Sequence, residues 1–249
     1  MLRFEREEEI LNILRAKKRV SVADLEKILY SSASSIRRDL TSLENKGLVK
    51  RYYGGVELLQ SNSNVTTFAA RTHQNVAARR IMAKKAAALV REGDIIFLDQ
   101  STSCLYVAHA LMDKSGITVV TSSVEILALL GQSKLEVYSC GGMLSHANRN
   151  CLVGDDAHNA FRAVRADYMF FASKAISDDG TIYDCTRQEV CLRNTMMENA
   201  NKIVYLCDSG KFGTMASYRQ CTLKQVDYLI CEQSVPEVYR HSYPALTIL

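Results

Sequence analysis

Two adjacent guanidinium groups, those of Arg37 and Arg38, stand in a segment with helical spacing. Guanidinium groups donate hydrogen bonds to phosphates and to base edges in the major groove of DNA. Successive side chains lie about 100° apart around a helix, so we expect one arginine to reach base edges or phosphates and the other to serve phosphates or an internal ion pair. The polar residues that we expect to face DNA from this segment are Ser32, Ser34, Ser35, Arg37, Arg38 and Thr41.

An apolar stripe predicts which face of this helix is buried. Ile36, Leu40 and Leu43 follow one another at steps of four and three residues, which places them on one side of a helix. Ser32 can cap the helix by accepting a hydrogen bond from a backbone N–H of the first turn, and Gly47 ends it. The remaining faces are left to the polar side chains.

Two further helical segments are predicted upstream, over residues 9–14 and 21–29. The second begins with Ser21 and has Asp24 three residues later, an imperfect version of the capping-box pattern. Three helices with short connections are typical of a helical DNA-binding unit.

A basic hairpin is predicted directly after the third helix. Strand-like residues 48–53 and 56–59 flank Gly54 and Gly55, a dipeptide that tolerates the positive φ angles of a tight turn. We therefore expect a winged helix-turn-helix over residues 1–59. The residues placed to touch backbone phosphates from the hairpin are Lys50, Arg51 and Tyr53.

The Arg-Arg-Asp run also has a less specific interpretation. Such runs are typical of a solvated helix face with local ion pairs, here to Asp39 or Glu44. Overall charge does not distinguish a DNA-binding face from a solvated one, because residues 1–60 hold twelve Lys and Arg and nine Asp and Glu, a difference of only three. The succession of cap, apolar stripe, glycine and basic hairpin favours DNA binding.

Three strings in this region resemble a known family. They are Ser-Ile-Arg-Arg-Asp-Leu at 35–40, Leu-Glu-Asn-Lys-Gly-Leu at 43–48 and Arg-Tyr-Tyr-Gly-Gly-Val at 51–56. They are similar to the DNA-binding domain of the DeoR family of bacterial transcription regulators, whose pattern is Thr-Ile-Arg-Arg-Asp-Leu and Arg-x-His-Gly-Gly-Ala. This sequence departs at Ser31, Ser35 and Tyr53, where the family usually has Val, Thr and His.

After a polar stretch the sequence alternates short apolar runs with helix-length segments. This alternation predicts βαβ units, so we expect an α/β domain with a Rossmann-like, mostly parallel sheet covered by helices. We place a linker over residues 60–76 and an effector-sensing and oligomerisation domain over residues 77–249. The apolar runs begin at Asp94, Ile117, Leu135, Tyr168, Lys202 and Val226.

Polar and glycine-rich loops follow several of these runs, and ligands bind at the carboxyl ends of strands in such sheets. Asp99 precedes three hydroxyl residues at the start of a helical segment, a natural anion site. Hydroxyls at 121–123, glycines at 141 and 142, and Asp208 with Lys211 occupy similar positions after later runs. Together these loops resemble a sugar-phosphate pocket, although Ser or Thr before a helix is usually only a cap.

The sensor domain of the DeoR family carries Asp-x-Gly-Thr-Thr, Thr-Asn, Gly-Gly, a Glu and Asp-x-x-Lys-Phe on a fold similar to sugar-phosphate isomerases. Asp208, Lys211 and Phe212 match the last motif. Ser101, Ser122 and Arg193 replace the usual Gly, Asn and Lys, and Lys174 stands where a small Ser-Gly pair is usual. The residues that we expect to bind the effector on this resemblance are Asp99, Ser101, Thr102, Ser103, Thr121, Ser122, Gly141, Gly142, Lys174, Glu189 and Lys211. Lys174 either adds a cation for an anionic ligand or fills the pocket, and a surface salt bridge is its less specific interpretation.

Composition and length are consistent with such a regulator. With 249 residues, 47% of them hydrophobic, the chain can bury one sizeable core and a small second one. The sequence has no extended apolar run and a charged start, so we expect a cytoplasmic protein that binds no membrane. Its eight cysteines form no C-x-x-C pair, and we interpret them as reduced, with no metal and no cofactor.

These observations support one main hypothesis and two alternatives. The main one is a DNA-binding repressor of a carbohydrate operon, a dimer or tetramer whose affinity for double-stranded operator DNA is controlled by a sugar phosphate or similar anion. Repression, rather than activation, is a family inference. In the first alternative the second domain has lost its ligand and only oligomerises; in the second, acid and base groups such as Asp99 and Glu189 make it an isomerase-like enzyme.

Overall fold

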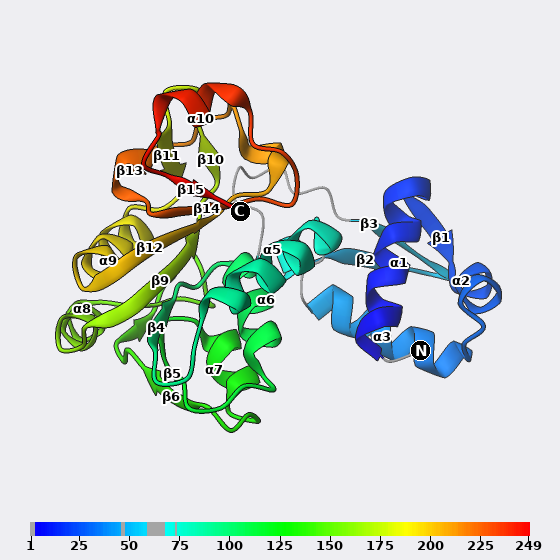
Figure 1. Cartoon of the computed structure of the whole chain (residues 1–249). Helices are drawn as coiled ribbons and strands as arrows, with labels where there is room; N and C mark the ends of the chain where they lie inside the picture. The colour runs from blue at the N-terminus through cyan, green and yellow to red at the C-terminus, as the bar shows by residue number, and fades with distance from the viewer. Residues whose placement is uncertain (1–2, 46–47, 59–67, 73) are drawn as a thin grey trace. The chain divides into compact units, whose positions relative to one another are not determined.

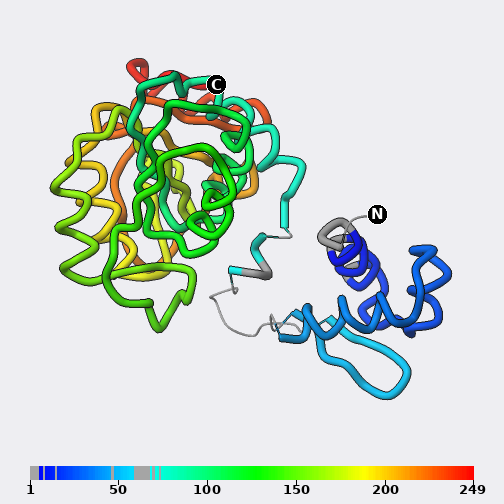
Figure 2. The backbone as a smooth tube through the Cα atoms, turned by 90° about the horizontal axis from the view of Figure 1, so that it is seen from below, coloured from blue at the N-terminus to red at the C-terminus, as the bar shows by residue number. Residues whose placement is uncertain are grey.

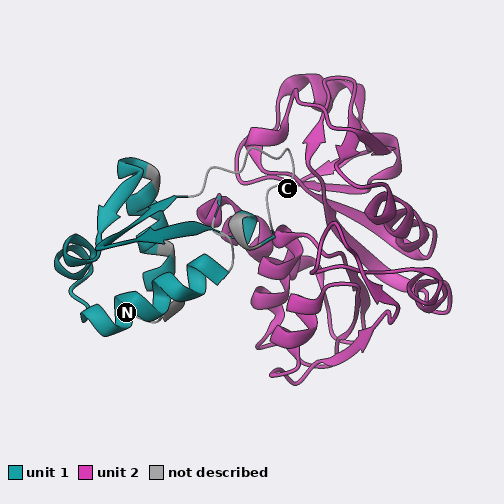
Figure 3. Ribbon diagram, turned by 180° about the vertical axis from the view of Figure 1, so that it is seen from behind, with its two compact units in different colours: residues 1–74 teal, residues 75–249 magenta. Residues whose placement is uncertain are grey.

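The computed structural model describes residues 3–45, 48–58, 68–72 and 74–249 (Figure 1). Contacts between Cα atoms divide the chain into two compact units, residues 1–74 and 75–249 (Figure 3). The finer division at residues 59 and 76 stays a prediction. Gly47 and most of the polar linker sequence lie outside the described residues, and the described part of that linker contains the short helix α4, Phe68–Thr72.

Helices and a three-stranded antiparallel sheet build the first unit. The strand order is β1-β3-β2, which makes β2 and β3 the hairpin expected after the third helix. Ile36, Leu40 and Leu43 are fully buried in the apolar core of this unit, so the predicted stripe is confirmed. The elements are α1 (Arg3–Lys17), β1 (Arg19–Ser21), α2 (Val22–Leu29), α3 (Ala33–Asn45), β2 (Val49–Tyr52) and β3 (Gly55–Leu58).

The turn of the hairpin differs from the expected Gly-Gly turn. Tyr52 pairs with Gly55, so the two turn residues are Tyr53 and Gly54, and of the two glycines Gly54 alone has a positive φ, of 82°. Gly55 belongs to β3, where an added Cβ would lie 2.7 Å from the hydroxyl oxygen of Tyr52. Gly54 is therefore needed for backbone conformation and Gly55 for space beneath the tyrosine ring.

A seven-stranded sheet, in which every neighbouring pair is parallel, forms the centre of the second unit. Its order is β15-β14-β12-β9-β4-β5-β6. All six apolar runs singled out in the sequence are strands of this sheet, and the predicted α/β class is confirmed. The strands are β4 (Ile95–Leu98), β5 (Thr118–Thr121), β6 (Glu136–Ser139), β9 (Ala166–Ala172), β12 (Ala200–Leu206), β14 (Tyr228–Ile230) and β15 (Thr247–Ile248).

Helices cover both faces of this sheet. Helices α5, α6 and α7 lie on one face, whereas α8 and α9 lie side by side on the other (Figures 1 and 2). The described residues contain no helix that is both long enough and apolar enough to span a membrane. These helices are α5 (Val76–Leu89), α6 (Thr102–Leu111), α7 (Val124–Leu130), α8 (Asp155–Arg162) and α9 (Arg187–Glu198).

The second unit also contains smaller elements. A three-stranded antiparallel sheet has the order β10-β11-β13, and β7 pairs with β8 in a short hairpin. These elements are β7 (Met143–Leu144), β8 (Leu152–Val153), β10 (Ala175–Ile176), β11 (Thr181–Asp184), η1 (Ser209–Lys211), β13 (Tyr218–Thr222), η2 (Leu223–Gln225) and α10 (Glu237–Ser242).

The strand order reverses between β4 and β9. From β4 the chain proceeds outward through β5 and β6, whereas from β9 it proceeds the other way through β12, β14 and β15. Loops that leave neighbouring strands in opposite directions leave a crevice at such a point, and ligands bind there in open α/β sheets. Asp99 follows β4 directly, so the fold itself places this carboxylate at the reversal point.

Candidate functional site

The first turn of α3 is held by a serine cluster. The Ser32 hydroxyl accepts a hydrogen bond from the backbone N–H of Ser35 at 3.4 Å, as the predicted cap requires. It also lies 3.1 Å from the hydroxyls of Ser34 and Ser35. Arg37 and Arg38 are exposed on the side of the helix away from its buried stripe.

Neither Arg37 nor Arg38 takes part in the ion pairs of the described residues of this unit. Asp39 is buried and pairs with Arg6 of α1, while Glu44 pairs with Arg51 of the hairpin. The local pairs of Arg37 or Arg38 with Asp39 or Glu44, which the solvated-face interpretation requires, do not form in the described part of the chain. The Nε atom of Arg38 donates to the Ser34 carbonyl at 3.4 Å, and no ion pair among the described residues holds either guanidinium group.

The hairpin is tied to α3 by Arg51. Its Nη1 atom donates to the Thr41 hydroxyl at 2.7 Å, and its backbone N–H donates to the Glu44 carboxylate at 3.0 Å. Thr41 and Arg51 therefore position the hairpin against the helix. Lys50 and Tyr53 extend from the hairpin as exposed side chains.

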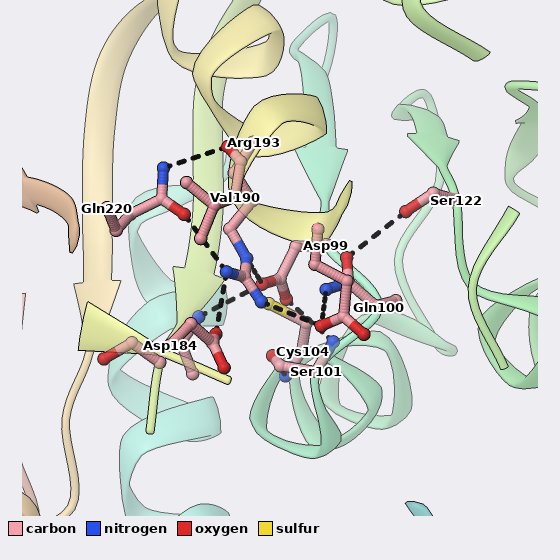
Figure 4. Close-up of polar contacts among 12 residues, drawn as sticks. Asp99, Gln100, Ser101, Cys104, Ser122, Asp184, Val190, Arg193 and Gln220 are labelled. Carbon is pink, nitrogen blue, oxygen red and sulfur yellow. Dashed lines mark hydrogen bonds and ion pairs between the residues drawn. The ribbon is translucent and has the colours of Figure 1, made fainter. Parts of the chain in front are cut away.

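In the second unit, Arg193 of α9 reaches Asp99 at the reversal point of the sheet (Figure 4). Its guanidinium lies 2.8 Å from the Asp99 carboxylate, 2.7 Å from Asp184 and 3.4 Å from Glu189. It also donates to the Gln220 side chain at 3.1 Å. This one side chain joins three parts of the chain, around residues 99, 184–193 and 220.

Amide side chains extend this network on the other side of Glu189. Gln100 donates to one Glu189 oxygen at 2.7 Å, and Asn148 donates to the other at 3.0 Å. Ser122 donates to the Gln100 oxygen at 3.5 Å, and Asn150 donates to the Gln100 carbonyl at 3.2 Å. The Arg193 cluster, defined as Asp99, Gln100, Ser122, Asn148, Asn150, Asp184, Glu189, Arg193 and Gln220, is a continuous buried network.

Electrostatics keep Arg193 charged. Burial acts to lower the pKa of Arg193, but the carboxylates of Asp184, Asp99 and Glu189 outweigh it and raise that pKa above its usual value. Three carboxylates and one guanidinium give the ionised cluster a formal charge of −2. Arg193 is therefore already neutralised by protein groups, and the cluster does not attract an anion by its net charge.

The hydroxyl and glycine loops have mainly structural contacts. Ser101 caps α6 by accepting from the backbone N–H of Cys104 at 3.2 Å, and Thr121 donates to the Leu98 carbonyl at 2.7 Å. Thr102 and Ser103 are buried in the first turn of α6. Gly141 and Gly142 are exposed, with φ of 67° and 91°.

Lys211 and Lys174 have different surroundings. Lys211 is half-buried and pairs with the Asp208 carboxylate at 3.1 Å, whereas Lys174 is exposed and its backbone N–H bonds to Tyr183. Burial acts to raise the pKa of Asp208, but Lys211, with Arg79 and the Asn75 amide, outweighs it and holds that pKa below its usual value. Lys211 is the better placed of the two to offer a positive charge beside the carboxyl edge.

Sequence reasoning did not predict most members of the Arg193 cluster. Gln100, Asn148, Asn150 and Gln220 have no motif, and their side chains meet only after the loops fold. The contact between Arg193 and Glu189 could have been predicted, because residues four apart in a helix lie on the same face. Among the described residues, no group of three or more His, Cys, Asp and Glu side chains is arranged to hold a metal ion.

Comparison with known families decides the class of protein. A model described as the DeoR-like helix-turn-helix domain matches residues 6–62, and one described as the DeoR C-terminal sensor domain matches residues 74–233. The chain belongs to the DeoR family. It is thus a DNA-binding transcriptional regulator, as the resemblance of its sequence motifs implied.

Curated relatives cover almost the whole of this DeoR-family chain. It is 31% identical to the HTH-type transcriptional regulator GolR of Listeria innocua, over 94% of this chain and 92% of that protein. It is 28% identical to the L-fucose operon activator of Haemophilus influenzae, over 98% and 99%, and 27% identical to a putative aga operon transcriptional repressor of Escherichia coli O157:H7, over 93% and 87%.

Proposed function

We propose that this DeoR-family regulator represses a carbohydrate operon and that a phosphorylated sugar, or a related anionic metabolite, controls its affinity for the operator. Relatives named for an L-fucose operon and an aga operon support the carbohydrate target. One of these relatives is named as an activator and the other as a repressor, so repression by this protein needs a test of its own. Deletion of the gene should raise transcription of the target operon, and a fall would reverse the assignment.

The DNA-binding step rests on one observation, the exposure of Arg37 and Arg38 opposite the buried stripe of α3. In a winged helix-turn-helix this face enters the major groove and the hairpin reaches the phosphates. Ser34 and Ser35 share the first turn, where base-edge contacts are usual. Lys50 and Tyr53 supply the phosphate contacts from the hairpin.

Replacing either arginine by alanine tests this assignment. We expect Arg37→Ala or Arg38→Ala to weaken binding to a duplex that the wild-type protein selects from a random pool by about 1–3 kcal/mol where the lost contact is to a base. Where the contact is to a phosphate, the slope of log affinity against log salt should fall by about one. Arg162→Ala removes an exposed arginine of α8 and is the matched control. Unchanged affinity and salt slope for both α3 variants would contradict the proposed face.

The effector is proposed to bind between the first turn of α6 and Lys211. Free N–H groups at the start of a helix and a nearby lysine both favour a phosphate. Because Arg193 is neutralised by carboxylates, Lys211 carries the electrostatic part of this proposal. The hydroxyls of the sugar would face the carboxylate and amide oxygens of the Arg193 cluster.

Isothermal titration with a panel of sugar phosphates tests this site. We expect at least one compound to release or absorb heat on binding, and Lys211→Ala to abolish that heat. The control is Lys134→Ala, which replaces an exposed lysine just before β6 and should leave the heat unchanged. Absence of heat with every compound would remove the effector assignment and leave the DNA assignment intact.

One observation favours the alternative in which the second domain has lost its ligand. The Arg193 cluster is completely satisfied by protein groups and its charge opposes an anion. Operator affinity unaffected by cell metabolites would favour that alternative. An isomerase is less well supported, because the relatives reported above are named as regulators and Arg193 pairs with both Asp99 and Glu189. Turnover of a sugar phosphate would support it.

A further inference from the structure

Asn75 is the residue at which the chain enters the second unit, and its side chain is bound to the loop after β12. Its Nδ2 atom donates to the Asp208 carboxylate at 3.2 Å. Asn75 stands at the N-cap position of α5, yet its side chain makes no cap hydrogen bond to that helix. The side chain that would ordinarily hold the helix start is thus committed to a loop 133 residues further along the chain.

The same carboxylate also binds Lys211. One Asp208 oxygen accepts from Asn75, while the other lies 3.1 Å from the Lys211 ammonium. Asp208 is almost fully buried, whereas Lys211 is half-buried and Asn75 is exposed. A change at Lys211 is therefore felt at Asn75 through one shared carboxylate.

The backbone at Asn75 is held in an unusual conformation. Its φ is 52° and its ψ is 36°, the left-handed region that asparagine tolerates better than most residues and glycine adopts freely. The carbonyl of Asn75 also accepts the backbone N–H of Arg79, which closes the first turn of α5. Asn75 thus joins the loop after β12 to the first turn of α5 through its side chain and its backbone.

We infer that Asn75 is a positioning residue that transmits the state of Lys211 to the segment leading to the DNA-binding domain. An anion that binds Lys211 competes with Asp208 for the ammonium group. Asp208 then rearranges toward Asn75, and the start of α5 changes with it. The inference rests on the proposed function only in taking Lys211 as the anion-binding group.

A double-mutant cycle tests the relay without any effector. Operator affinity is measured for Lys211→Ala, Asn75→Gly and the double variant, on the duplex selected by the wild-type protein and at one salt concentration. Allosteric couplings are typically about fivefold or more. In the otherwise wild-type protein, we expect Lys211→Ala to change the dissociation constant of the operator complex about fivefold. In the Asn75→Gly variant, the same substitution should change that constant by less than about twofold. Glycine keeps the positive φ, so Asn75→Gly removes the amide without straining the backbone.

Equal changes in the two backgrounds, or no change in either, would overturn the relay. Lys134→Ala should have no effect in either background. If Lys211→Ala does not fold, Lys211→Met replaces it in the same cycle. Hydrogen exchange gives a second readout, because Asp208→Asn, which still accepts from Asn75, should protect residues 75–80 better than Asp208→Ala. Equal protection in these two variants would also count against the relay.

The outcome is separable from that of the effector proposal. Titration of wild-type protein with sugar phosphates reports whether an anion binds, whereas the cycle reports whether Lys211 and Asn75 are coupled. Coupling without any titration heat would leave the relay standing and remove the effector. Heat without coupling would leave the effector standing and remove the relay.

Discussion

At the scale of single residues, the second unit depends on one buried guanidinium. Arg193 is only 2% exposed and balances carboxylates from three different segments. A buried ion network is weak evidence for net stability, because each ion loses its hydration. Removing one member is costly, however, since the others are left buried and unpaired.

We therefore expect Arg193→Ala to lower the free energy of unfolding by about 3–5 kcal/mol, the usual cost of breaking a buried pair. Urea denaturation followed by circular dichroism measures this change. Arg162→Ala should shift the free energy by less than about 0.5 kcal/mol, as expected for an exposed position. Equal effects of the two substitutions would show that the carboxylates do not need Arg193.

The cysteines should differ sharply in reactivity. Burial raises the pKa of Cys140, Cys207 and Cys221 to about 12 and that of Cys231 to about 11. Since the thiolate is the reactive form, these groups should not react at neutral pH. Exposed Cys191, followed by half-buried Cys185, should react with a thiol reagent in the native protein. Mass spectrometry of the labelled peptides checks this order, and early labelling of Cys207 would contradict it.

At the scale of elements, the turn between α2 and α3 has a strained residue. Tyr30 closes α2 in the left-handed region, with φ 48° and ψ 43°, and is 96% exposed. Glycine is the usual residue for this conformation, since a Cβ costs about 1–2 kcal/mol there. The turn is formed in spite of its residue type, because Leu29 and Ile36 on either side are buried in the core.

We expect Tyr30→Gly to raise the free energy of unfolding by about 1 kcal/mol. Tyr30→Ala keeps a Cβ in the same conformation and should give no such gain, so it is the matched control. Chemical denaturation of both variants measures the difference. A gain of the same size in both would attribute the effect to loss of the exposed ring.

The elements themselves were largely predictable. Apolar runs such as Ile95–Leu98 are short and bounded by aspartate, and the spacing of Ile36, Leu40 and Leu43 is helical, so local pattern sufficed. The strand order and the edge strand β15 were not predictable, because pairing between distant strands leaves no mark in a local window. The hairpin was predicted, but its turn was placed one residue too late.

At the scale of the whole molecule, the two units have separate apolar cores. The core of the first contains Leu40, and that of the second contains Phe171. Among the residues that the structure describes, none belongs to both of these cores. The two units can therefore unfold as separate cooperative steps.

Scanning calorimetry should show two transitions. Leu40→Ala should destabilise the first unit by about 2–5 kcal/mol and leave the transition of the second unchanged, and Phe171→Ala should do the reverse by about 3–5 kcal/mol. A single transition that shifts with either substitution would show that the units unfold together.

The sequence by itself determined the DNA-binding unit, because its cap, stripe and hairpin are local patterns within sixty residues. It also determined the class of the second domain, since each strand and helix has its own periodicity. Only the tertiary structure decided the partners of the predicted pocket. Asp99 meets Arg193 across 94 positions, and Asn75 meets Asp208 across 133, and such pairs arise from strand order, which no local pattern encodes.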